Sequence, residues 1–123
     1  MKILVLGATG QLGTNLVRML LARNVPVRAL IRPTSKGTTL EGLEIERIPR
    51  DLNDPNCLAI ACQGIQVVYH TPGYYPYSTI SGKEARARAL KETHNVLDAV
   101  RHSSVERFIF TSTLTTIGFP GEP

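Results

Sequence analysis

The chain has 123 residues, of which 42% are hydrophobic and 20% charged, values that are typical of a small globular domain and exclude a disordered chain. No apolar run reaches the roughly 18 residues of a membrane helix, and no secretory signal layout precedes the first apolar segment. The formal net charge of +4 suits an anionic small ligand better than nucleic acid, because no aromatic side chains interleave with a basic stripe. We therefore expect a cytoplasmic domain without membrane or nucleic-acid partners.

Short apolar segments alternate with helical patterns along the chain. Strands are expected where apolar or alternating runs of about five residues are bounded by glycine, proline or asparagine, and helices where apolar residues recur every three or four positions. The predicted strands are residues 2–6, 26–31, 43–48, 65–70 and 107–111, and the predicted helices are residues 11–23, 54–63 and 83–102.

Two of the helices are expected to bury one apolar stripe each. The predicted stripes are Leu12, Leu16 and Leu20 in the first helix, and Leu90, Thr93, Leu97 and Val100 in the longest.

The alternation of strands and helices predicts an α/β fold, because continuously apolar strands are typical of a parallel sheet that is buried on both faces. Right-handed crossovers then give a doubly wound sheet of about five strands in the order 3-2-1-4-5, within three layers, which is the Rossmann arrangement. The last strand would form an exposed apolar edge, so we expect something to cover it.

Cysteine and histidine usage predicts neither a disulfide nor a metal site. Cys57 and Cys62 are five positions apart in a predicted helix, on different faces, and the three histidines are scattered. Of these, His70 is interpreted as a core residue at a strand end.

The segment GATGQLG, residues 7–13, stands between the first strand and the first helix. A helix N-terminus at the carboxyl edge of a sheet offers unpaired N–H groups and partial positive charge to a pyrophosphate. Gly7 would allow the sharp turn, Gly10 the approach of phosphate to the backbone, and Gly13 the close packing of helix on sheet. The alternative is a tight strand–helix turn without a ligand.

GATGQLG resembles the G-A-T-G-x-x-G motif of the extended branch of the short-chain dehydrogenase/reductase superfamily, which includes sugar-nucleotide epimerases and dihydroflavonol-4-reductase-like enzymes. Four further segments resemble motifs of that family in the same order: RDLND at 50–54, VVYHTPG at 67–73, THNVLDAV at 93–100 and VERFIFTST at 105–113. The resemblance implies that residues 1–123 are a dinucleotide-binding Rossmann domain that ends before the C-terminal catalytic and substrate portion.

The end of the second strand favours NADP over NAD. An acidic residue there would bind the ribose 2′-hydroxyl, whereas this chain carries Arg32, with Lys36 nearby, and a guanidinium can pair with a 2′-phosphate. The alternative is that Arg32 is only a solvated residue at a strand end. The resemblance implies that Asp51 meets the adenine ring; N-capping or turn formation is its alternative role. The complete predicted cofactor set is Gly7, Thr9, Gly10, Gln11, Leu12, Gly13, Arg32, Lys36, Asp51, Leu52, Thr71, Pro72 and Gly73.

The resemblance implies a catalytic Tyr and a Lys four residues later, with a hydroxyl residue nearby, because a Lys ammonium lowers the pKa of the phenol. Thr113 matches the hydroxyl position; capping of the sheet edge is its alternative role. No tyrosine of the chain has a Lys four positions later, and Ala89 stands where many members carry an Asn. Tyr74, Tyr75 and Tyr77 either line a substrate pocket or belong to an exposed loop.

Three functions remain open from the sequence. The first is the NADP(H)-binding portion of an oxidoreductase that acts on a small molecule, either a carbonyl reductase or a nucleotide-sugar epimerase. The second is a non-catalytic NADP(H)-binding or sensor module, with a homodimer through the fifth strand or the long helix. The third is a folded fragment with neither activity nor binding.

Overall fold

The computed structural model describes residues 1–49, 51–73, 81–113 and 121. Strands and helices alternate along most of the chain, as the hydrophobic pattern predicts. The elements are β1 (Ile3–Leu6), α1 (Gln11–Ala22), β2 (Val27–Ile31), the 3-10 helix η1 (Thr38–Leu40), β3 (Glu46–Pro49), α2 (Pro55–Cys62), β4 (Val67–His70), α3 (Gly82–Arg101) and β5 (Arg107–Phe110).

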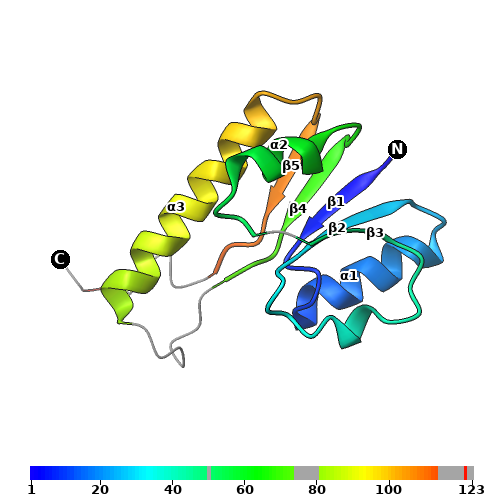
Figure 1. Ribbon diagram of the computed structural model, residues 1–123, viewed down its shortest axis with the longest axis horizontal. Coiled ribbons are helices and arrows are strands. Elements are labelled where there is room, and N and C mark those ends of the chain that lie inside the picture. Colours follow the sequence, from blue (N-terminus) through cyan, green and yellow to red (C-terminus); the bar gives the residue numbers. More distant parts are fainter. Residues whose placement is uncertain (50, 74–80, 114–120, 122–123) are drawn as a thin grey trace.

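All neighbouring strands pair in parallel, and the sheet order is β3-β2-β1-β4-β5. Figure 1 shows α1 on one face of this sheet and α2 and α3 on the other, which gives three layers. The predicted doubly wound sheet and its strand order are therefore confirmed. In the part of the chain that the structure describes, no helix is long and apolar enough to cross a membrane.

Strand β1 divides the core between the two faces of the sheet. Leu4 and Leu6 belong to the cluster under α2 and α3, whereas Ile3 and Val5 belong to the cluster under α1. All four side chains are at most 3% exposed, because β1 is flanked by a strand on each side and by helices on both faces. A continuously apolar strand is the sequence pattern that such a position requires.

The third strand begins later than the alternating pattern predicts. It starts at Glu46 rather than at residue 43, because the preceding residues form a turn around Gly42, whose φ is +73°. The guanidinium of Arg47 donates to the carbonyl oxygens of Leu40 at 2.7 Å and Leu43 at 3.1 Å. These bonds hold the segment in its turn and leave a shorter strand.

The predicted apolar stripes of the two helices are confirmed in part, because Leu20 of α1 is buried and Leu16 and Val100 pack against the core clusters. In α1, Leu12 is 53% exposed, and the buried residues are Gly13, Thr14, Val17 and Leu20. In α3, Leu90 and Leu97 are exposed, and Val96 is the buried residue. The face of each helix that meets the sheet is rotated relative to the predicted one, so that Leu12, Leu90 and Leu97 lie toward solvent.

Arg28 connects β2 to β3 and to α2. It lies near the N-terminal ends of the strands, at the end of the sheet opposite the glycine loop. Its side chain is 11% exposed and pairs with Glu46 at 3.0 Å. The same guanidinium donates to the carbonyl oxygens of Ala61 at 2.8 Å and Gln63 at 2.7 Å, and so caps the C-terminus of α2. Arg28 and Lys2, which also pairs with Glu46, hold the pKa of the Glu46 carboxyl below its usual value.

Candidate functional site

The glycine loop packs directly against the segment that follows β4. Gly7 has a φ of +77°, and a Cβ added there would lie 2.7 Å from Thr71 Oγ1 and 2.8 Å from the Pro72 nitrogen. The Thr71 hydroxyl is itself held, because it donates to the Leu6 carbonyl oxygen at 2.7 Å. Only glycine therefore fits position 7, for reasons of both conformation and space.

The other side of the loop packs against its own helix. A Cβ on Gly13 would lie 2.2 Å from the Gly7 carbonyl oxygen and 2.8 Å from Ala8 Cα, which are backbone atoms that cannot swing aside. One position later, the buried Thr14 hydroxyl donates to the Ala8 carbonyl oxygen at 2.9 Å. The loop is thus fixed at both ends before any ligand is present.

The N-terminus of α1 opens toward the space above this loop. Gly10 is its N-cap residue, no side chain caps it among the described residues, and no acidic residue stands in the first turn. The first amide bonded back into the helix is that of Thr14, which donates to the Gly10 carbonyl oxygen at 2.8 Å. The Gly10 amide donates to the Gly7 carbonyl oxygen at 3.0 Å, so the amides of residues 11 to 13 and the helix dipole are available to an anion.

A cleft of about 450 Å³ lies over the glycine loop and the carboxyl ends of β2 and β4. It brings together most of the predicted cofactor residues and adds Leu30, which the sequence analysis missed because nothing distinguishes it from any other apolar strand residue. The residues that line the cleft are Gly7, Thr9, Gly10, Gln11, Gly13, Leu30, Arg32, Leu52, Thr71, Pro72 and Gly73.

Three predicted cofactor residues, Leu12, Lys36 and Asp51, do not line this cleft. Leu12 projects from the outer face of α1, and Lys36 is exposed beyond a turn in which the Ser35 amide donates to the Arg32 carbonyl oxygen at 2.9 Å. Asp51 stands one residue before Leu52, in the turn that follows β3. Cofactor contact by these three side chains stays a prediction.

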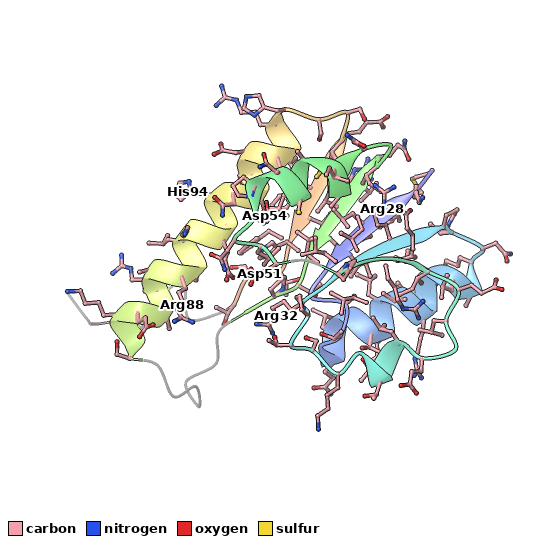
Figure 2. All side chains as sticks on the ribbon, in the orientation of Figure 1. Arg28, Arg32, Asp51, Asp54, Arg88 and His94 are labelled. Carbon is pink, nitrogen blue, oxygen red and sulfur yellow. The ribbon has the colours of Figure 1, made fainter. Side chains whose placement is uncertain are left out.

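Arg32 is the charged residue of the cleft wall. It follows β2 immediately, its side chain is exposed, and no aspartate or glutamate accompanies it among the described residues that line the cleft. Figure 2 shows Arg32 and Asp51 in the same region, well away from Arg28 at the other end of β2. A guanidinium in an open cleft can approach a phosphate without first breaking an ion pair.

The turn after β3 is organised by hydrogen bonds of its own side chains. Asp51 Oδ1 accepts from the Asn53 amide at 2.8 Å and from Asn53 Nδ2 at 2.9 Å, which is the turn-forming role considered for Asp51. Asp54 then caps α2 by accepting from the Cys57 amide at 3.2 Å. Leu52, between Asp51 and Asp54 in the sequence, is 7% exposed. It belongs to the core and also lines the cleft.

A second cavity of about 80 Å³ adjoins the cleft and shares Pro72 with it. Its described lining includes Ala89, Glu92 and Thr93 of α3, together with His70 and Phe110. His70 is 4% exposed and stacks on Phe110 with ring centroids 4.9 Å apart. Neither of its ring nitrogens has a hydrogen-bond partner among the described residues, and burial lowers the pKa of His70. His70 is thus a core histidine at a strand end, as expected.

The predicted catalytic residue Thr113 is exposed and follows β5 by three positions. It is absent from the described lining of both cavities, and its catalytic role stays a prediction. Tyr74, Tyr75 and Tyr77 lie outside the described residues.

Other sequence interpretations concern residues away from the cleft. Cys57 and Cys62 are buried, and no disulfide joins them. No group of three metal-ligating side chains occurs in the described ranges. Residues 83–92 form a mostly solvated face of α3, where Arg88 pairs with Glu84 at 2.6 Å.

Comparison with known proteins finds relatives that match nearly the whole of this chain. The model of the NAD dependent epimerase/dehydratase family matches residues 3–123. The chain is 37% identical to sterol demethylase protein B of Methylococcus capsulatus, covering 96% of this chain and 36% of that protein. It is 36% identical to a Synechocystis sp. protein provisionally named dihydroflavonol 4-reductase, covering 96% of this chain and 34% of that protein.

Among solved structures, the chain resembles a short-chain dehydrogenase/reductase superfamily protein from Agrobacterium tumefaciens with bound NAD. The TM-score is 0.75 at 27% identity, over 92% of this chain and 33% of that one. The chain thus spans about a third of the length of the curated relatives described above.

Proposed function

We propose that this chain, which belongs to the NAD dependent epimerase/dehydratase family, is the NADP(H)-binding portion of a carbonyl reductase. Nicotinamide-cofactor binding is the property of the family, and NAD is bound in the similar Agrobacterium tumefaciens structure. The reductase assignment draws support from the relative provisionally named dihydroflavonol 4-reductase. In a complete enzyme the acid–base pair and the substrate pocket would come from sequence that follows this domain.

The residues present fit a dinucleotide. The observation that carries the proposal is the fixed glycine loop, because Gly7 and Gly13 occupy positions where a side chain would strike backbone atoms, and the uncapped start of α1 lies beside them. Such a cradle suits a pyrophosphate, and the apolar wall formed by Leu30 and Leu52 suits a flat aromatic base. When bound, the nicotinamide group would supply hydride transfer.

The preference for NADP over NAD rests on Arg32. Its guanidinium lines the cleft at the carboxyl end of β2, where the ribose of a bound dinucleotide is expected, and the described lining holds no carboxylate to repel a 2′-phosphate. A bidentate guanidinium–phosphate pair in a partly exposed site contributes about 1.5–3 kcal/mol. The expected preference is therefore at least tenfold.

Calorimetric titration of the purified chain with NADP⁺ and with NAD⁺ tests the proposal. We expect NADP⁺ to bind at least tenfold more tightly, and Arg32→Ala to remove most of that preference while changing NAD⁺ affinity little. Arg101→Ala, at the exposed C-terminus of α3, is the matched control for loss of positive charge. Equal affinities in the unmodified chain would contradict the NADP assignment, and no binding of either nucleotide would contradict the cofactor function itself.

A further inference from the structure

Helix α3 holds the turn after β3 at two points. Asn95 Nδ2 donates to the Leu52 carbonyl oxygen at 3.0 Å, and Asn53 Nδ2 donates to Glu92 Oε1 at 3.0 Å. Glu92 and Asn95 are three residues apart and hence lie on one face of the helix. Both contacts join segments about forty positions apart in the chain, and they connect the turn to α3.

The Asn53 side chain bridges two carboxylates. Its amide nitrogen donates to Asp51 Oδ1 at 2.9 Å and to Glu92 Oε1 at 3.0 Å, which uses both of the hydrogens that an Asn side chain offers. In the described part of the chain, Asp51 Oδ2 accepts no hydrogen bond, whereas Oδ1 accepts two. The orientation of the Asp51 carboxylate is thus set through Asn53, and that of Asn53 through Glu92.

This turn borders the cleft at the wall where a base would lie. Leu52 lines the cleft beside Leu30 and Arg32, and its carbonyl oxygen is the group that Asn95 binds. The Asp51 carboxylate, one residue earlier, is therefore attached to a wall residue whose backbone α3 holds in place. A carboxylate oxygen without a partner at such a wall can accept from an exocyclic amino group.

We propose that Glu92 and Asn95 are positioning residues that orient Asp51 toward the adenine amino group, an inference that rests on the proposed function of the cleft. Neither residue lines the cleft. They act through Asn53 and Leu52, by keeping one carboxylate oxygen pointed outward while the other is occupied.

A paired titration separates this role from a merely structural one. The probes are NADP⁺ and its hypoxanthine analogue, in which an oxygen replaces the adenine amino group. Since Asp51 accepts from the amino group and repels the oxygen, the unmodified chain is expected to bind NADP⁺ at least tenfold more tightly than the analogue. Glu92→Ala is expected to reduce that ratio to about threefold or less, because Asn53 then loses its second anchor.

Three further variants complete the test. Glu92→Gln keeps an oxygen acceptor for Asn53 and is expected to retain the ratio, whereas Asn95→Leu is expected to reduce it. Lys91→Ala, at an exposed position of the same helix, is the control and should leave it unchanged. All titrations are run below the melting temperature of each variant.

The outcomes distinguish the inference from the function on which it rests. If the unmodified chain binds neither nucleotide, the proposed function fails. If it binds both equally, or if Glu92→Ala and Asn95→Leu weaken both nucleotides by the same factor, the function survives and the positioning role is overturned. A reduced ratio in both variants, with retention in Glu92→Gln, supports the inference.

Discussion

Replacing Gly13 by alanine tests the account of the glycine loop, because it adds a single methyl group at the most crowded position. The added Cβ would lie 2.2 Å from the Gly7 carbonyl oxygen and 2.8 Å from the Gly7 carbonyl carbon. Both atoms belong to a turn that is held by Thr71 and Pro72 on its other side. Relief therefore requires α1 to move away from the sheet or the turn to open.

The magnitude follows from two opposing effects. Overpacking a rigid site costs about 1–3 kcal/mol, and the backbone contacts at Gly13 favour the upper end of that range. Alanine in place of glycine within a helix recovers about 1 kcal/mol of helix propensity. The net expectation is a loss of about 2 kcal/mol in the free energy of unfolding, which lowers the melting temperature by about 8 °C for a domain of this size.

Urea unfolding followed by circular dichroism measures this loss, with Gly10→Ala as the matched control. At position 10 the nearest atom to an added Cβ is the Gly7 carbonyl oxygen at 3.4 Å, an ordinary contact. Gly10→Ala should therefore cost at most about 1 kcal/mol, the usual effect of Ala at an N-cap, and should weaken nucleotide binding, since Gly10 lines the cleft. A Gly13→Ala chain as stable as the original would refute the packing argument.

Three other expectations can be checked with simple assays. Arg28→Met should lower the free energy of unfolding by roughly 2 kcal/mol, because two carbonyl oxygens at the end of α2 lose a charged donor; an unchanged urea midpoint would contradict this. Burial lowers the pKa of His70, so below about pH 6.5 the unfolded chain binds a proton that the folded chain does not, and stability should fall with decreasing pH. His70→Phe should flatten that dependence between pH 7.5 and 5.5, and an unaltered slope would place its origin elsewhere. Burial raises the pKa of the Cys62 thiol, so a thiol reagent should label Cys62 slowly in the native state and rapidly in urea; rapid native labelling would show that α2 opens readily.

The sheet and the loop were predictable because their sequence patterns have few structural solutions. Five short runs of apolar or alternating residues, separated by helical patterns, leave the parallel doubly wound sheet as the natural arrangement. The glycines at positions 7 and 13 are required by a turn conformation and by a backbone contact, and no other residue type would satisfy either. Residue type alone therefore predicted the position of the cleft.

The helix faces and the wall around the base were less predictable. Leu90 and Leu97 have the spacing of a core stripe but are exposed, whereas Val96, Ala99 and the predicted Val100 pack in the core. Periodicity alone does not determine how far a helix is rotated about its axis on the sheet. Lys36 is near Arg32 in sequence but is absent from the lining of the cleft, and its contact with a cofactor stays a prediction. The hydrogen bond from Asn53 to Glu92 of α3 joins segments that are distant in the sequence, so no local sequence pattern predicts it.

The cleft arises from the order in which the chain crosses the sheet as well as from the side chains that line it. From β1 the chain passes through α1 on one face to β2, and from β3 through α2 on the opposite face to β4 (Figure 1). The helices that follow β1 and β4 lie on opposite faces of the sheet, and a crevice opens where the direction of winding reverses. Loss of the glycines would abolish the proposed phosphate cradle without closing that crevice. A relative that had lost its nucleotide would thus keep a ready-made hollow for another ligand.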